Sequence, residues 1–287
     1  QNADGSWSES RYPHNTAITS YALLAFLSQG HLPDRGLYGP EVAKGARFLT
    51  ASARPDGYLI GTRGGNMYCH GMATLALSQL YGMTGDAELR QALADAVELI
   101  VRTQSNQGGW RYEPRPTDAD ISVTIMQVMA LRGAKNAGLH VPDRTMERAL
   151  EYIERCYDPR SGGYRYQPGS RGPGFARTAA GICVTKLVGE YDRDVGKSVE
   201  YLKDNMESRE HFFYGHYYAA HAMYQVGGKD WKEYYSKTRD MLLKNQDASG
   251  AWTTRSLDRN HVGPVYQTAI AVIVLSVPGH YLPIFQR

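Results

Sequence analysis

Cysteine is scarce in this sequence of 287 residues, and its three copies lie far apart, at Cys69, Cys156 and Cys183. An odd number of widely spaced cysteines, with no Cys-x-x-Cys pair, argues against a disulfide framework and against a cysteine-based zinc site. We therefore expect no metal and no cofactor.

Long apolar runs and runs of basic residues are also lacking. The longest apolar stretch, residues 269–277, is about half of the ~20 residues that a membrane-spanning helix needs. The formal net charge is only +3, without an arginine-rich stripe, which makes a nucleic acid a poor candidate for a partner. The sequence starts at Gln1 without a leader-like segment, so it indicates no compartment. We expect it to be part of a longer chain that has room for a companion domain.

Phenylalanine is rare, whereas tyrosine is abundant: the sequence has 6 Phe and 21 Tyr. A tyrosine side chain offers both a ring face and a hydroxyl group, which suits the lining of a wet, concave surface. This imbalance predicts a tyrosine-lined binding surface.

A seven-residue motif, Gln-x-x-x-Gly-x-Trp, recurs along the chain. It is complete at residues 1–7, 104–110 and 246–252. Weaker copies lie around Gly57 and Gly162, and the glycines from Gly5 to Gly162 are spaced by 52, 51 and 54 residues. The 88 residues from Gly162 to Gly250 leave room for two shorter units, with a decayed turn near residues 207–211. We therefore predict six repeated units.

Each unit contains an apolar helix, and amphipathic helices alternate with the apolar ones. The apolar helices are expected at residues 15–29, 68–80, 120–131, 177–187, 216–225 and 267–275. The amphipathic helices are expected at residues 41–49, 87–103, 144–156, 195–205 and 231–244. Helices that are apolar on most faces are buried, so this pattern predicts an inner and an outer ring of helices.

The predicted fold is an all-α (α/α)6 barrel that forms a single domain over residues 1–287. The sixth outer helix is expected to precede Gln1, because each complete motif follows an outer helix. An open helical solenoid is the alternative. It is disfavoured because the last inner helix is as apolar as the others, whereas a solenoid needs polar capping repeats.

The repeated turn resembles the repeats of terpenoid cyclases of the squalene–hopene type and of protein prenyltransferase β subunits. The whole chain is similar to bacterial proteins with prenyltransferase/squalene-oxidase repeats. The resemblance is carried by residues 1–7, 67–77, 108–112, 120–131 and 281–285. It implies an α/α barrel that acts on an isoprenoid, although the same ring also carries sugar-processing enzymes.

Polar residues at the N-terminal ends of the predicted inner helices are expected to meet at one opening of the ring, where helix dipoles add positive partial charge. The candidate ligand-binding residues are Tyr68, Arg177, Tyr214, Tyr218, Tyr266 and Gln267. The candidate catalytic residues are Asp118, Asp120, His70 and His216.

Asp118 and Asp120 stand where squalene–hopene-type cyclases carry Asp-x-Asp-Asp, with Ile121 replacing the last aspartate. The resemblance implies that Asp120 is the acid that protonates an alkene, with Asp118 and a histidine in support. Such chemistry needs a neutral carboxylic acid in a dry aromatic cavity. The alternative interpretation is that Asp120 only caps the third inner helix. The Asp and Cys ligands that hold zinc in prenyltransferases are not matched.

The same polar residues above tyrosine rings also suit a sugar ligand. Two carboxylates across a groove would allow hydrolysis, and a set of Tyr, His and Arg would allow β-elimination. Three functions therefore stay open: an isoprenoid cyclase, a polysaccharide lyase or hydrolase, and a non-catalytic binding or interaction module.

Overall fold

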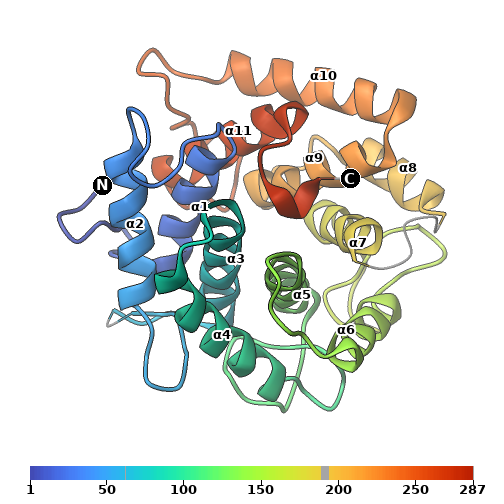
Figure 1. The fold of residues 1–287 in the computed structure, drawn as a ribbon. Helices are drawn as coiled ribbons and strands as arrows, with labels where there is room; N and C mark the ends of the chain where they lie inside the picture. Colours follow the sequence, from blue (N-terminus) through green and yellow to red (C-terminus); the bar gives the residue numbers. More distant parts are fainter. Residues whose placement is uncertain (62, 189–193, 287) are drawn as a thin grey trace.

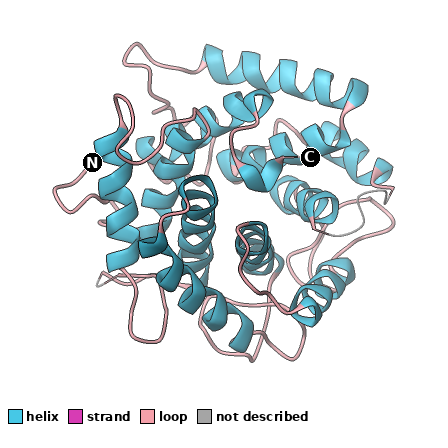
Figure 2. Cartoon of the chain, viewed as in Figure 1, coloured by secondary structure: helices cyan, strands magenta, loops and turns pink. Residues whose placement is uncertain are grey.

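The computed structural model describes residues 1–61, 63–188 and 194–286, and in these segments the secondary structure is helical (Figure 2). The extended segments among these residues form only isolated bridges, such as that between Trp110 and Asp120. In the same segments, no helix is both long enough and apolar enough to cross a membrane.

Two concentric layers of helices make up the fold (Figure 1). The inner helices are α1 (Thr16–Leu27), α3 (Met67–Thr84), α5 (Ile121–Asn136), α7 (Phe175–Leu187), α9 (Phe212–Val226) and α11 (Pro264–Ser276). The outer helices are α2 (Gly39–Ala51), α4 (Ala87–Arg102), α6 (Asp143–Arg155), α8 (Gly196–Asp204) and α10 (Gly228–Lys244). The sequence pattern therefore identified all eleven of these helices, with boundaries that differ by a few residues.

The inner helices form a closed ring. Each contacts the next inner helix along the chain, and α11 also contacts α1, so the two ends of the array meet. The outer helices pack on the outside, for example α2 against α1 and α3, and α10 against α9 and α11. The prediction of an (α/α)6 barrel is thus confirmed, and the open solenoid is ruled out by the contact between α1 and α11.

The Gln-x-x-x-Gly-x-Trp turn connects successive outer helices through side-chain hydrogen bonds, as its second complete copy, residues 104–110 after α4, illustrates. Trp110 Nε1 donates a hydrogen bond of 2.8 Å to the carbonyl of Ile100 in α4. Gln104 Nε2 donates to the carbonyls of Gly108, at 2.7 Å, and of Thr145 in α6, at 2.9 Å. The motif therefore recurs because it fastens each outer helix to the next.

The turn glycine Gly108 is required for two separate reasons. Its φ of +95° lies in the left-handed region, and a Cβ atom there would be 2.3 Å from the carbonyl oxygen of Arg148. Gly138 also has a positive φ, of +86°, but a Cβ atom there would meet nothing within 4 Å. The two positions thus share the backbone conformation and differ only in the space around it.

We expect Gly138→Ala to lower the free energy of unfolding by about 1 kcal/mol, the cost of the left-handed conformation. Gly108→Ala is expected to lower it by roughly 3 kcal/mol, because the backbone of α6 must also shift. Urea-induced unfolding followed by circular dichroism compares the two variants directly. Equal losses would contradict the close packing of the turn against α6.

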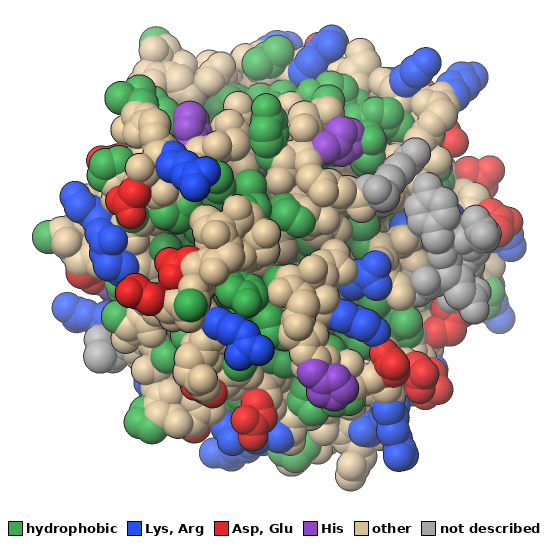
Figure 3. All heavy atoms as spheres, in the orientation of Figure 1, with side chains coloured by type: hydrophobic (Ala, Val, Ile, Leu, Met, Phe, Trp, Pro, Cys, Tyr) green, Lys and Arg blue, Asp and Glu red, His purple; other side chains and the backbone are tan. Residues whose placement is uncertain are grey.

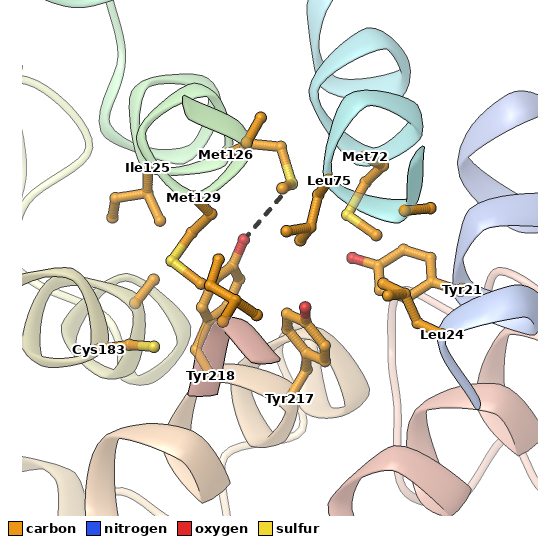
Figure 4. Packing of buried hydrophobic residues seen from close by; sticks show 14 of the residues in the cluster. Tyr21, Leu24, Met72, Leu75, Ile125, Met126, Met129, Cys183, Tyr217 and Tyr218 are labelled. Carbon is orange, nitrogen blue, oxygen red and sulfur yellow. Dashed lines mark hydrogen bonds between the residues drawn. The ribbon is translucent and has the colours of Figure 1, made fainter. Parts of the chain in front are cut away.

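The interior of the ring is filled by side chains. Tyr21 from α1 and Tyr217 and Tyr218 from α9 point towards one another in the middle, with methionines of α3 and α5 around them (Figure 4). Tyr217 and Tyr218 are fully buried, and the Tyr218 hydroxyl lies 3.8 Å from the sulfur of Met126. The barrel therefore has no deep central channel.

The C-terminal segment closes one end of the barrel, the end at which the inner helices finish (Figure 1). The backbone N–H of Ile284 donates to Gln79 Oε1 at 3.0 Å, and Gln225 Nε2 donates to the carbonyl of Phe285 at 2.9 Å. The Phe285 ring stacks on His221 with 3.3 Å between ring centroids. Figure 3 shows this face: its middle is filled, and charged side chains of both signs are scattered around it.

Candidate functional site

A cavity of about 400 Å³ lies at the opposite end, where the inner helices begin. Seven of its lining residues are tyrosines: Tyr12, Tyr21, Tyr68, Tyr112, Tyr166, Tyr214 and Tyr266. The other lining residues include Asn15, Asn66, Ser122, Arg177 and His211. We call this space the tyrosine cavity. No aspartate or glutamate is among the described residues that line it.

Three tyrosines from different inner helices form a connected group at the bottom of the tyrosine cavity. The hydroxyl oxygens of Tyr21 and Tyr68 are 2.6 Å apart, and the rings of Tyr21 and Tyr266 meet edge to face at 5.2 Å. Burial raises the pKa of all three phenols above the ordinary value. They therefore stay protonated at neutral pH, as hydrogen-bonding groups rather than bases.

Arg177 and His211 supply the cationic and titratable groups of the tyrosine cavity. The Arg177 side chain is half-buried and donates to the carbonyl of Gly172 at 3.3 Å, but it forms no ion pair with another described residue. His211 precedes α9 and has a φ of +52°, a rare conformation for a residue with a side chain. Asn260 Oδ1 accepts the backbone N–H of His211 at 3.0 Å and helps to hold this conformation.

Asp120 lies behind the wall of the tyrosine cavity rather than in it. It is the N-cap of α5, where its Oδ1 accepts the backbone N–H of Val123 at 3.0 Å, and its side chain is fully buried. Burial raises its pKa, although the Val123 N–H, the nearby Tyr166 hydroxyl and the Arg111 guanidinium all favour the carboxylate. Asp118 forms an ion pair of 2.6 Å with Arg111.

These contacts correct the expectation of a cyclase acid. A protonating acid has to face its substrate in a dry cavity, whereas Asp120 caps a helix inside a filled barrel. Arg111 lies beside both aspartates, 2.6 Å from Asp118 and 3.9 Å from Asp120. The helix-capping interpretation of Asp120 is the one that the geometry supports.

His70 and His216 point outwards, towards the outer helices, and not towards the tyrosine cavity. His70 Nδ1 accepts the backbone N–H of Leu59 at 3.1 Å, and its Nε2 lies 3.2 Å from the carbonyl of Ala96 in α4. His216 contacts the Tyr234 hydroxyl of α10 at 2.7 Å and the carbonyl of Met206 at 3.1 Å. The expectation that both face the opening was wrong, because each ring satisfies buried backbone groups between the two layers.

Two of the six predicted ligand-binding residues also lie away from the tyrosine cavity. Tyr218 is packed in the barrel interior, and Gln267 donates through Nε2 to the carbonyl of Thr254 at 3.0 Å. The remaining four, Tyr68, Arg177, Tyr214 and Tyr266, line the cavity together.

Among the lining residues that sequence reasoning missed are four tyrosines and a histidine, namely Tyr12, Tyr21, Tyr112, Tyr166 and His211. Tyr21 lies in the second turn of α1, and the other four lie in the segments that precede inner helices. The excess of tyrosine was the only signal that pointed to most of them. Among the described residues, no group of three or more His, Cys, Asp or Glu side chains is placed to hold a metal ion.

No protein-family model and no curated protein matches this sequence. Several solved structures share its fold. The α-1,6-mannanase of a Salegentibacter species, in complex with α-1,6-mannotriose, has a TM-score of 0.70 at 9% identity, over 99% of this chain and 95% of that one. A family 76 glycoside hydrolase from Bacteroides thetaiotaomicron has a TM-score of 0.75 at 9% identity, over 97% and 73%.

A third similar structure is the cellobiose 2-epimerase of Bacillus thermoamylovorans, with a TM-score of 0.69 at 12% identity, over 92% of this chain and 88% of that one. Sequence identities this low show a common fold and nothing finer. None of these three is an isoprenoid cyclase or a prenyltransferase, so the expected cyclase identity gains no support. The chain is an (α/α)6 barrel of the architecture that mannanases and sugar epimerases also use.

Proposed function

We propose that this protein binds a carbohydrate in the tyrosine cavity. The observation that carries the proposal is the lining of the cavity, in which seven tyrosines surround a space of about 400 Å³. Aromatic faces pack against the C–H faces of sugar rings, and neutral phenol and amide groups hydrogen-bond to sugar hydroxyls. Support also comes from the similar barrels, two of which are described with a mannanase or a glycoside hydrolase activity.

Hydrolysis of the bound carbohydrate by a pair of carboxylates is less favoured than binding alone. It requires two carboxyl groups on opposite sides of the bound sugar, roughly 5–9.5 Å apart. No described lining residue of the tyrosine cavity carries a carboxylate, and Asp120 is buried behind it. One similar mannanase was made inactive by changing two consecutive aspartates to asparagine, and this sequence contains no two consecutive aspartates.

A second candidate function is the cleavage of a uronate-containing glycan by β-elimination. His211 favours it, because a histidine in a strained backbone conformation at the rim of a cavity is typical of a functional position. In this mode His211 removes the proton beside the uronate carboxylate, and Arg177 pairs with that carboxylate. The glycosidic C–O bond breaks as a C=C bond forms, and the leaving oxygen takes a proton from a tyrosine hydroxyl of the tyrosine cavity.

The test of the proposed function uses tyrosines that can be changed without disturbing the core. Tyr12 and Tyr112 lie at the rim of the tyrosine cavity and are 45% and 38% exposed, whereas Tyr281, 52% exposed, lies at the closed end. We expect Tyr12→Ala and Tyr112→Ala each to raise the Kd of a bound oligosaccharide about 5-fold, through the loss of roughly 1 kcal/mol of ring packing.

Titration calorimetry with manno-, cello-, galacto- and galacturono-oligosaccharides provides the measurement, with Tyr281→Ala as the matched control. The control is expected to bind as the wild type does. If no oligosaccharide binds, or if Tyr281→Ala weakens binding as much as the rim variants do, the tyrosine cavity is not a carbohydrate site.

A further inference from the structure

A second, larger depression adjoins the tyrosine cavity at the open end of the barrel. It has a volume of about 910 Å³ and is formed by the segments that precede α1, α9 and α11. Tyr12, His211 and Val262 line both spaces, so the two lie side by side. Because three of its lining residues are Arg11, Arg255 and Arg259, we call it the arginine groove.

The three arginines of the groove are not neutralised by neighbouring side chains. Arg11, Arg255 and Arg259 are all exposed, and none of them forms an ion pair with a residue of the described segments. Two further lining residues, His211 and His261, add imidazole rings to the groove. A concave surface with unpaired guanidinium groups attracts anions and binds carboxylates or sulfates in a bidentate manner.

The acidic residues of the groove form hydrogen bonds to backbone N–H groups in its walls. Glu9 is 7% exposed, and its Oε1 accepts the backbone N–H of Tyr266 at the start of α11, at 2.9 Å. Asp258 is 3% exposed and accepts the backbone N–H groups of Asn260, at 2.8 Å, and of Phe213 in α9, at 3.3 Å. Buried carboxylates with these partners fix the loops and do not pair with the arginines.

Arg177 lies on the other side of His211 and adds a positive charge to the lining of the tyrosine cavity. Among the described residues that line a smaller pocket of about 170 Å³ with Arg177 and His211, Glu210 is the only carboxylate, and it is exposed. The basic side chains therefore follow a path from the arginine groove, past His211, to the tyrosine cavity. Such a path suits a polymer with an anionic group on successive residues.

We infer that the arginine groove binds an acidic polysaccharide, with carboxylate or sulfate groups, that extends from the tyrosine cavity. This inference rests on the proposed carbohydrate function and names its substrate class. Sugar rings fill the tyrosine cavity, and the acidic groups of the following residues pair with Arg11, Arg255 and Arg259. A nucleic acid also carries regular negative charge, so it serves as a competitor in the test.

The test compares an oligogalacturonate with the neutral oligogalactoside of the same length, by calorimetry at low salt. We expect the wild type to bind the acidic oligosaccharide at least 10-fold more tightly. The double variant Arg255→Gln/Arg259→Gln is expected to reduce that preference about 10- to 100-fold and to make binding less dependent on salt. The matched control is Arg47→Gln/Arg90→Gln, which removes two exposed arginines from outer helices and is expected to keep the preference.

Two results would overturn the inference. One is equal affinity of the wild type for the acidic and the neutral oligosaccharide. If Tyr12→Ala still weakens the binding of both, the proposed carbohydrate function stands and only the preference for acidic groups fails. The other is equally tight binding of a single-stranded oligonucleotide of the same charge, because the groove would then be a general polyanion surface. Absence of binding by every oligosaccharide would remove both the proposed function and this inference.

Discussion

Acidification from pH 7 to pH 4 is expected to unfold this protein, because three histidines are buried in the neutral form. Burial lowers the pKa of His70 and His216 from 6.5 to about 4, and that of His221 to about 3. The unfolded chain therefore binds more protons than the folded chain between pH 6.5 and these values. Stability is complete above about pH 6.5 and decreases as the pH falls through this window.

The size of this effect follows from the pKa shifts. A shift of one pKa unit corresponds to about 1.4 kcal/mol, so His70 and His216 each remove roughly 3 kcal/mol of stability once the pH reaches 4. Domains are typically stable by only about 5–15 kcal/mol, so two or three such residues are enough to unfold one. Urea-unfolding midpoints measured from pH 4 to pH 8 would record the decline.

His221 provides the internal control for the acid effect. Neither of its ring nitrogens has a hydrogen-bond partner among the described residues, whereas both nitrogens of His70 and His216 have one. His221→Leu is therefore expected to preserve or raise stability at pH 7 and to reduce the pH dependence by about a third. An unchanged pH dependence in this variant would show that other groups control acid unfolding.

The second large effect is expected from Trp110→Ala, in the turn between α4 and α5. Trp110 is 1% exposed, and its Nε1 satisfies the carbonyl of Ile100. Truncation removes the largest side chain of the local core and leaves that carbonyl with only the longer hydrogen bond of 3.3 Å from Thr103 Oγ1. We expect a loss of about 3–5 kcal/mol in the free energy of unfolding, measured by urea unfolding.

Trp7 occupies the same position in the first copy of the motif but is only half-buried, with its ring 6.0 Å from that of Phe26. Trp7→Ala is expected to cost about 1–2 kcal/mol, in proportion to the smaller apolar area that it buries. If the two variants lose the same stability, burial of the motif tryptophan does not determine its contribution.

The sequence predicted the fold well because the fold depends on patterns that are local and repeated. Gly108 and Trp110 can be recognised in one turn, and the same turn recurs at intervals of about fifty residues. An inner helix must be apolar on most faces and an outer helix on one, so alternation of the two types indicates two layers. Closure of the ring then follows from the contact between α1 and α11.

The site was predicted less well because the direction of a side chain depends on how its helix is rotated in the barrel. Tyr68 and His70 are two residues apart at the start of α3, yet Tyr68 lines the tyrosine cavity and His70 points to α4. Their spacing in the sequence does not indicate which of the two side chains faces the cavity. Tyr12 and His211 come from segments between helices, where no periodicity indicates which side chains converge.

The Asp118-x-Asp120 motif was misleading for a related reason. Aspartate is favoured both at a helix N-terminus and in catalytic sites, so Asp118-x-Asp120 fitted two interpretations. The hydrogen bond from the Val123 N–H, the burial of the carboxyl group and the position of Arg111 distinguish between them. The four residues that were correctly placed in the cavity are those whose helix position happens to face inwards.

The C-terminal segment that packs on Gln79, Gln225 and His221 makes the barrel a cup rather than a tunnel. A polymer cannot be threaded through it, so a glycan at the tyrosine cavity lies across the rim or inserts one end. Whatever enters must leave by the same route. Sliding of a chain through the ring in successive steps is excluded, and each encounter with a polymer begins and ends at the same opening.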